Sequence, residues 1–563
     1  MNILKKLVLL LVLGLTLASC GTTKTTTTTE STTTTEVGNY EPQLQQFATL
    51  YNDTDLQNWQ LSDPYESYHP GMSVEKAYNT ILKGKPATTV IVAIVDAGID
   101  INHEDLKEII WVNKDEIPNN GIDDDKNGYI DDINGWNFLG HKDGRMVTGE
   151  QLEYVRIIKK HRAQWKDKSI ADIDAKDIAM YKEYNRAEDL LKVKLAELEP
   201  LEARLGQMQM GGTMFFTALK KHLNTETLTT EAVQGIKTED ENLLRAKGAY
   251  LQGFTPDYLK RFTNYIEGQT KYNLNLDFNG RIQGDDPDDL SDIGYGNNNV
   301  IPPSEDELHG THVGGIVAAV RNNGKGGNGV SDFVQLMSIR AVPDGDEYDK
   351  DIALAFRYAV DNGAKVINCS FGKYFSPHKD WVWDAIKYAE KHDVLIVNGV
   401  GNEGKDMDKY GTMMSYPNDG DVAGQEIADN FLNVGAVGPN YGANMVADFS
   451  NFGKETVDVF SPGVKIYATV PYSKYKHLRG TSMASPDAAG VAALIRSRYP
   501  NLTASQVKHI IMDSGMKPNI QVISPQEDGY EGEPKLVPFA DLSKSGAFIN
   551  AYNALLMAED MSK

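Results

Sequence analysis

The chain has 563 residues, which at about 150 residues per domain is enough for three or four domain-sized units. Its 41% hydrophobic and 24% charged residues are ordinary globular usage, which excludes a disordered, collagen-like or multi-span membrane protein. The 56 Lys and Arg residues against 79 Asp and Glu residues give a net charge of -23, so nucleic acid is not expected as a partner. With two cysteines, Cys20 and Cys369, the chain has neither a disulfide framework nor a thiolate cluster for zinc.

The first 20 residues have the features of a secretory signal. Two lysines precede a short apolar run at residues 7–18, which is too short to cross a bilayer of roughly 30 Å as a helix. Residues 1–19 are therefore predicted to be a signal peptide that is removed. The sequence Leu-Ala-Ser-Cys at 17–20 resembles the lipobox of bacterial lipoproteins, which implies lipidation of Cys20 as the new N-terminus. An ordinary secretory signal with a stray cysteine is the alternative.

A Thr-rich stretch follows the cysteine and is too polar and repetitive to bury apolar area. We interpret residues 20–36 as a lipidated cysteine with a tether, and residues 37–84 as an N-terminal segment. The residue after Cys20 is Gly rather than Asp, which by resemblance to Gram-negative lipoproteins favours the outer over the inner membrane. The expected location is the cell envelope, with the protein held in the membrane by its N-terminal lipid.

An α/β body begins at a continuous β-branched run at 90–95, which is typical of a strand buried on both faces of a parallel sheet. Similar short apolar runs alternate with amphipathic stretches at 351–362 and 381–392. This order predicts an α/β fold with a doubly wound parallel sheet, whose functional sites lie at the carboxyl ends of the strands. The later strand candidates are 335–342, 365–371, 394–397, 432–437 and 457–460.

Residues 147–265 do not follow this alternation of strands and helices. Their composition is rich in Lys, Glu, Ala, Leu, Met and Arg at helical spacing. We predict an α-helical subdomain inserted between two parts of the α/β domain, residues 85–146 and 266–563, the second of which includes a C-terminal segment. Two roles stay open for the insert: a bundle that only decorates the surface, or an element that gates the site or binds a partner not yet identified. Long insertions cost little free energy yet are often functional.

Three Gly-rich islands carry an acid, a base and a nucleophile. Asp96 ends the first strand, where a rigidly held carboxylate suits the orientation of a neighbouring imidazole. His309 stands among small residues that open a helix and allow close backbone approach. Ser482 precedes an apolar helix at 488–495, so it lies at a helix N-terminus, where backbone N–H groups can stabilise an oxyanion.

At these islands the sequence resembles the subtilisin-like serine endopeptidases, or subtilases, whose catalytic groups occur in the order Asp, His, Ser. The similarity spans about residues 85–140 and 275–510. A fourth island at 397–404 is similar to the family segment whose Asn donates to the oxyanion, and Asn402 occupies that position.

The resemblance implies a serine-type endopeptidase that hydrolyses peptide bonds of protein or peptide substrates without an organic cofactor. Ser482 would attack the carbonyl, His309 would accept and return the proton, and Asp96 would hold the imidazole. Asn402 and the backbone N–H of Ser482 would bind the oxyanion. The alternative is a catalytically silent, subtilase-like binding lipoprotein, and the presence of all four residues argues against it.

Two further segments resemble the walls of the family's primary specificity pocket. They are Ser370, Phe371 and Gly372 on one side, and Gly399, Val400 and Gly401 on the other. Asp487 departs from the family pattern, because a His usually follows the Pro there. His312 and Ser485 lie close to the catalytic positions, and we interpret them as a buried, hydrogen-bonded His and a helix-packing Ser.

Residues 123–134 carry the second chemical signal, an alternation of oxygen-bearing side chains. Hard oxygen ligands favour calcium, so we predict a structural calcium site, with an acidic solvated turn as the alternative. The twelfth place is Asn134 rather than Glu, which makes a full EF-hand doubtful, and Asp132 is a possible substitute. A second acidic stretch at 285–289 lacks this spacing and is predicted to be a surface turn. The ligand candidates are Asp123, Asp125, Asn127, the carbonyl of Tyr129, and Asp131, with Gly128 at the sixth place.

Overall fold

The computed structural model describes residues 56–410, 415–420, 424–527, 530 and 532–563, so Cys20 and the predicted signal peptide and tether lie outside the described residues. Its centre is a seven-stranded sheet in which neighbouring strands are parallel, which confirms the predicted α/β class. In spatial order the strands are β2 (Gly135–Asn137), β3 (Val334–Arg340), β1 (Val90–Asp96), β4 (Val366–Cys369), β5 (Leu395–Gly399), β6 (Phe431–Val437) and β7 (Val459–Pro462).

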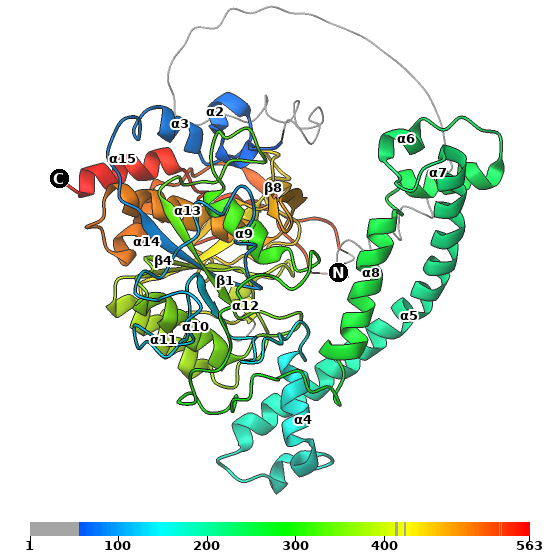
Figure 1. Cartoon of the computed structure of the whole chain (residues 1–563), viewed down its shortest axis with the longest axis horizontal. Helices are drawn as coiled ribbons and strands as arrows, with labels where there is room; N and C mark the ends of the chain where they lie inside the picture. The colour runs from blue at the N-terminus through cyan, green and yellow to red at the C-terminus, as the bar shows by residue number, and fades with distance from the viewer. Residues whose placement is uncertain (1–55, 411–414, 421–423, 528–529, 531) are drawn as a thin grey trace, which may run out of the picture.

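Helices cover both faces of this sheet (Figure 1). Val92 and Ile94 of β1 belong to one apolar core, while Ala93 and Val95 belong to the other. Both faces are therefore buried, which explains why the strands are continuous apolar runs. The first core includes α3 (Val74–Asn79), α9 (His309–Ala318), α13 (Thr481–Arg498), α14 (Ala504–Ser514) and α15 (Ala551–Met561), and the second includes α10 (Asp349–Asp361) and α11 (Lys379–Lys391).

Shorter elements surround this body. Trp59 and Met72, before the first strand, are buried in the first core, so residues 56–84 pack as part of the α/β domain. The short elements are η1 (Trp59–Leu61), α2 (Pro64–Ser67), α12 (Met407–Tyr410), the hairpin β8 (Ile466–Val470) and β9 (Lys474–Leu478), the pair β10 (Gln521–Ile523) and β11 (Leu536–Pro538), and η5 (Phe539–Asp541).

The strand register brings the carboxyl ends of three neighbouring strands to one edge of the sheet. Val95 of β1 pairs with Cys369 of β4, and Cys369 pairs with Asn398 of β5. Asp96, Ser370 and the turn at 399–402 therefore follow at the same level, although they lie far apart in the sequence. This edge is where parallel α/β sheets place their functional groups.

Between β2 and α9 the chain leaves the body as a helical arm (Figure 1). Its longest helix, α5, has 46 residues and is roughly 70 Å long. The last helix, α8, ends at Gly268, three residues beyond the predicted boundary of the insert. Neither α5 nor any other described helix is long and apolar enough to cross a membrane. The arm consists of α4 (Glu153–Trp165), η2 (Ile170–Asp172), α5 (Ile178–Leu223), α6 (Thr230–Gln234), α7 (Glu241–Leu251), α8 (Pro256–Gly268) and η3 (Gln269–Asn273).

The arm has two separate apolar cores. The core nearest the body joins residues of α4, α5 and α8 to Phe375, which belongs to the α/β domain. The core at the far end joins α5, α6 and α7, and Phe215 and Phe216 pack against it. Met210 and Met214 on α5 are 68% and 71% exposed, so these two side chains are not part of the arm's own core.

The prediction of a surface turn at 285–289 is wrong for its first residue. The carboxylate of Asp285 is fully buried, 2.6 Å from the guanidinium of Arg281 and 2.6 Å from the ammonium of Lys350 on α10. Burial alone would raise the pKa of Asp285, but these two cations lower it below its usual value. The carboxylate can therefore stay charged inside the protein, because it is paired on both sides.

Candidate active site

Asp96 and His309 form a hydrogen-bonded pair at the carboxyl edge of the sheet. Asp96 ends β1 and is 1% exposed, and both of its carboxylate oxygens lie 2.9 Å from Nδ1 of His309, the first residue of α9. Its Oδ1 also accepts the backbone N–H of Ala97 at 2.7 Å. A carboxylate beside Nδ1 favours the proton on that nitrogen, which leaves Nε2 of a neutral His309 as the acceptor.

Gly310 allows α9 to come this close to β1. A Cβ atom at Gly310 would lie 2.4 Å from the carbonyl oxygen of Gly98 and 3.1 Å from Cβ of Asp96. A larger residue would therefore push the start of α9 away from the strand, and His309 away from Asp96.

The environment of His309 sets its protonation. Burial favours the neutral ring, but the charge and hydrogen bond of Asp96 outweigh burial and raise the pKa of His309 above its usual value. A reaction that needs the neutral ring is therefore expected to speed up as the pH rises through this raised pKa.

Ser482 is the second residue of α13 and forms two reciprocal hydrogen bonds with Ser370. The hydroxyl of Ser482 donates to the carbonyl oxygen of Ser370 at 3.1 Å, and the hydroxyl of Ser370 donates to the carbonyl oxygen of Ser482 at 2.9 Å. Ser370 lines two cavities: one of about 690 Å³ together with Asp96 and His309, and one of about 220 Å³ together with Ser482. The two cavities adjoin at this residue.

The amide of Asn402 has a defined orientation. Its Oδ1 accepts the backbone N–H of Thr481 at 2.8 Å and the hydroxyl of Thr481 at 3.2 Å. A backbone N–H can only donate, so the atom facing it must be the amide oxygen. The Nδ2 group of Asn402 is therefore the end of the amide that is available as a donor. The amide is held by Thr481, the residue directly before Ser482.

Five of the six residues predicted to bind substrate line the smaller cavity. Val400 does not, because its side chain is 5% exposed and lines a different cavity with Asn398 and Pro417. Gly399 is required for close approach, since a Cβ there would lie 2.9 Å from the carbonyl oxygen of Thr481. The five are Ser370, Phe371, Gly372, Gly399 and Gly401; the structure adds Lys373, Tyr374, Asn402, Glu403, Ser415, Thr481 and Ser482.

The arm holds one wall of this smaller cavity. The ammonium of Lys373 is buried 2.8 Å from the carboxylate of Glu153, the first residue of α4. Arg186 of α5 donates to the carbonyl oxygen of Tyr374 at 3.0 Å and stacks on the ring of Phe375 at 3.6 Å. Residues 372–375 are therefore fixed from behind by two helices of the insert. Sequence reasoning missed this link, because no motif joins residues so far apart.

His312 and Ser485 have structural environments, in agreement with their interpretation from the sequence. His312 is fully buried, Nε2 lies 3.0 Å from the carbonyl oxygen of Lys476, and burial lowers the pKa of His312 to about 3. Ser485 is also fully buried, and its hydroxyl donates to Oδ1 of Asn368 at 2.8 Å.

Asp487 is an unusual residue of the helix that carries Ser482. Its side chain is fully buried, and neither carboxylate oxygen has a hydrogen-bond partner among the described residues. Burial raises the pKa of Asp487 well above its usual value, so the folded protein holds this carboxyl in its neutral form.

Asp487→Asn is expected to stabilise the protein at neutral pH but not near pH 4. Because the folded pKa lies above the unfolded value of about 3.9, the free energy of unfolding falls as the pH rises, by up to about 1.4 kcal/mol per unit relative to the variant. Denaturant unfolding at pH 4.5 and 7.5, with both proteins in a Ser482→Ala background, measures this. The exposed Asp513→Asn on α14 is the matched control. An equal difference between Asp487→Asn and its parent at both pH values would contradict the expectation.

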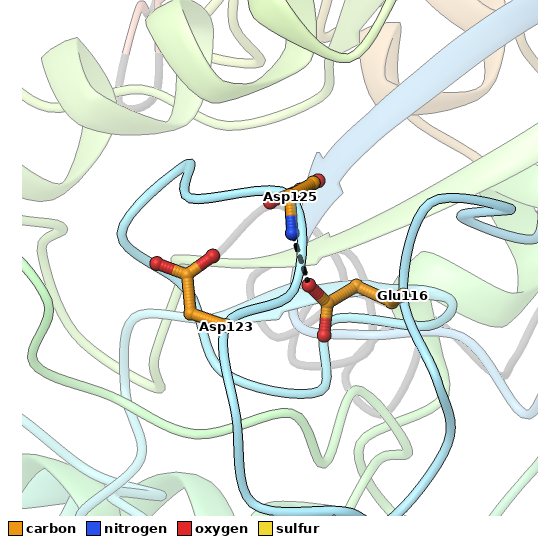
Figure 2. Close-up of side chains that lie close together, drawn as sticks. All are labelled: Glu116, Asp123 and Asp125. Carbon is orange, nitrogen blue, oxygen red and sulfur yellow. Dashed lines mark hydrogen bonds between the residues drawn. The ribbon is translucent and has the colours of Figure 1, made fainter.

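The acidic loop gathers some of the predicted metal ligands. Ligand oxygens of Asp123, Asp125 and Glu116 lie within 4.8 Å of one another (Figure 2). Glu116 was missed by sequence reasoning, because it lies outside the alternating spacing. It also braces the loop: Oε1 accepts the N–H groups of Asp124 and Asp125, and Oε2 accepts that of Asp131.

The other candidates are placed differently. Nδ2 of Asn127 donates to Asp125 at 3.0 Å, which keeps this side chain at the cluster. The carboxylate of Asp131 instead accepts the N–H groups of Asn120 and Gly121. The ring of Tyr129 is buried in the second core.

The site has the groups of a serine hydrolase: a serine at a helix N-terminus, an imidazole held by a carboxylate, and an amide donor beside the serine. The chain belongs to the subtilase family, whose sequence profile matches residues 87–530. This finding confirms the resemblance drawn from the four islands.

Several known proteins are similar to this chain. The thermophilic serine proteinase of Bacillus sp. (strain AK1) is 37% identical over 204 residues, which are 36% of this chain and 46% of that protein. Subtilisin DY of Bacillus licheniformis is 37% identical over 202 residues, which are 36% of this chain and 68% of that protein. A solved structure of a protease from Pseudoalteromonas arctica is 26% identical to this chain, with a TM-score of 0.35. The match covers 50% of this chain and 78% of the chain in that structure. The matched segment thus spans about half the length of the first of these relatives.

Proposed function

We propose that this subtilase is a serine endopeptidase that hydrolyses peptide bonds of proteins through an acyl-enzyme. The observation that carries the proposal is the buried Asp96 carboxylate on Nδ1 of His309, next to a cavity that meets the Ser482 cavity at Ser370. Membership of the subtilase family and the similarity to named serine proteinases support the same activity.

The reaction follows from these groups. The hydroxyl of Ser482 turns from the carbonyl of Ser370 toward Nε2 of His309, which takes its proton as Oγ attacks the substrate carbonyl carbon. Nδ2 of Asn402 and the N–H of Ser482 hold the oxyanion. His309 then protonates the leaving amine, which departs and leaves the acyl-enzyme. A water molecule next attacks the acyl carbon while His309 takes its proton, and His309 returns this proton to Oγ of Ser482 as the carboxylic acid product leaves. Asp96 keeps the proton of His309 on Nδ1 and stabilises the imidazolium.

Labelling by a fluorophosphonate probe tests the nucleophile directly. We expect covalent labelling of the wild-type protein and none of Ser482→Ala, because the probe reacts only with an activated serine. If the wild type stays unlabelled under conditions in which it is folded, the protein is instead a silent, subtilase-like binding protein.

We also propose that Cys20 is lipidated and anchors the protein in the cell envelope, in the outer membrane of a Gram-negative bacterium. The support is the lipobox-like sequence at 17–20, which lies outside the described residues. Cys20→Ser is expected to shift the protein from the membrane fraction to a soluble or unprocessed form. Mass spectrometry that finds an unmodified N-terminus downstream of Cys20 as the main wild-type species would refute the anchor.

A third proposal is that the acidic loop binds a structural calcium ion. The donor set fits this ion, since Glu116, Asp123 and Asp125 present carboxylates close together. The ion would hold the loop in place and takes no part in the proposed hydrolysis.

Calcium is expected to raise the melting temperature of the Ser482→Ala protein, and a chelator to lower it. Binding to the folded state alone adds about 2.7 kcal/mol when calcium is 100-fold above its dissociation constant. Differential scanning calorimetry with calcium, with magnesium and with chelator measures the effect, and Asp123→Asn should lose the response to calcium. A melting temperature that none of these conditions changes would leave only an acidic turn.

A further inference from the structure

The larger cavity, which contains Asp96 and His309, has one wall made by the insert. Asn264, Tyr265, Glu267 and Gly268 at the end of α8 and Tyr272 in η3 line it. On the other sides lie the segment that leads into α9 and residues 342–344, which follow β3. The insert thus contributes directly to the surroundings of the proposed catalytic pair.

This wall is fixed to the α/β domain. Nδ2 of Asn273 donates to the carbonyl oxygens of Glu150 and Asp344, at 2.9 and 3.1 Å. Gly268 lies so close to Asp344 that a Cβ there would be 3.0 Å from its Oδ2, and a Cβ at Gly149 would be 2.5 Å from the ring of Tyr272. These contacts favour a permanent wall over a loose surface decoration.

The lining is strongly acidic. It includes five carboxylates, and among the described residues that line it there is no Lys or Arg. Four of these acids have a partner, because Asp96 is hydrogen-bonded to His309 and three others form ion pairs. The ion pairs are Asp306 with Lys260, Glu267 with Lys271, and Glu307 with Arg340.

Asp344 is the fifth carboxylate of the lining, and it forms no ion pair among the described residues. Asp344 is exposed to solvent where it lines the cavity, and its charge adds to the effect of burial in raising the pKa of Glu307. Two carboxylates that disfavour each other's charge would both gain from a cation bound beside them. Tyr265 and Tyr272 add aromatic rings, whose faces attract cations.

We propose that this cavity is a subsite for a lysine or arginine side chain of the substrate, with Asp344 as the residue that selects the positive charge. The inference rests on the proposed endopeptidase function and names part of its substrate preference. Since the two cavities meet at Ser370, the basic side chain belongs to a residue near the scissile bond other than the one in the smaller cavity. The cavity of about 690 Å³ also has room for the aliphatic stem of that side chain.

Peptide hydrolysis tests the selection. A set of fluorogenic peptides places Lys, or its uncharged analogue norleucine, at each of four positions on either side of the scissile bond. At one position we expect wild-type kcat/KM to favour Lys by tenfold or more, and Asp344→Asn to bring the ratio close to one, mainly by lowering kcat/KM for the Lys peptide. Asp189→Asn on α5, with a side chain that is 79% exposed, makes the same charge change away from the cavity and should keep the wild-type ratio.

Binding to Ser482→Ala separates this proposal from the proposed function. Fluorescence anisotropy of the best Lys and norleucine peptides should show tighter binding of Lys, and the difference should shrink as salt is added and disappear with Asp344→Asn. If peptides bind with this preference but the wild type cuts none of them, the function fails and the subsite stands. If the wild type cuts peptides with no preference for Lys at any position, or Asp344→Asn and Asp189→Asn behave alike, the subsite is overturned.

Discussion

Ser482→Ala and His309→Ala are each expected to abolish the hydrolysis of casein and of small peptides, with kcat lowered about a million-fold, the size of the effect known for subtilisin. A serine hydroxyl without a base is a poor nucleophile at neutral pH, and a base without the hydroxyl has nothing to activate. Because the two groups act as one unit, the double variant should lose hardly more than either single variant.

The measurement is steady-state kinetics on a chromogenic peptide, with circular dichroism to show that each variant is folded. His509→Ala is a matched control, since His509 forms another His–Asp pair, 3.0 Å from Asp429, with a side chain that is 51% exposed and outside both cavities. It should keep full activity. Substantial residual activity in Ser482→Ala or His309→Ala would show that the reaction uses other groups.

Asn402→Ala is expected to lower kcat by about a hundred- to a thousandfold and to change KM little, as removal of the corresponding donor does in subtilisin. The amide oxygen is held by Thr481, so the side chain is already aimed before substrate binds. A donor in place in advance stabilises charge that develops only in the transition state, and its loss therefore appears in kcat.

Asn402→Asp separates the two ends of this amide. The aspartate keeps an oxygen for the N–H of Thr481 but has no donor in place of Nδ2, so its loss of kcat should be at least as large as that of Asn402→Ala. A loss confined to KM in both variants, or normal kcat in Asn402→Asp, would mean that Asn402 only positions the start of α13.

Structure could be predicted best where a single short segment of sequence is enough to indicate it. The run at 90–95 predicted a strand buried on both sides, and β1 is that strand at the centre of the sheet. The islands around Asp96, His309 and Asn402 could be located because their glycines are needed for close approach, as at Gly310 and Gly399.

Features that depend on contacts between distant segments could not be predicted. The burial of Asp285 needs the ammonium of Lys350, which is 65 residues away in the chain. Glu116 joins the acidic loop only because the chain folds back on itself. The insert has the composition of any helical bundle, so its position between Asp96 and His309 left its role open, and which of its helices would line the cavity with His309 could not be predicted.

The two walls of the smaller cavity differ in how freely evolution can change them. One wall is backbone at Gly399, where any side chain would collide with Thr481, so its shape cannot be altered by substitution. The other consists of residues 372–375, held by Glu153 and Arg186 from the arm. We therefore expect substitutions in α4 and α5, which line neither cavity wall themselves, to change the side-chain preference of the proposed endopeptidase by shifting residues 372–375.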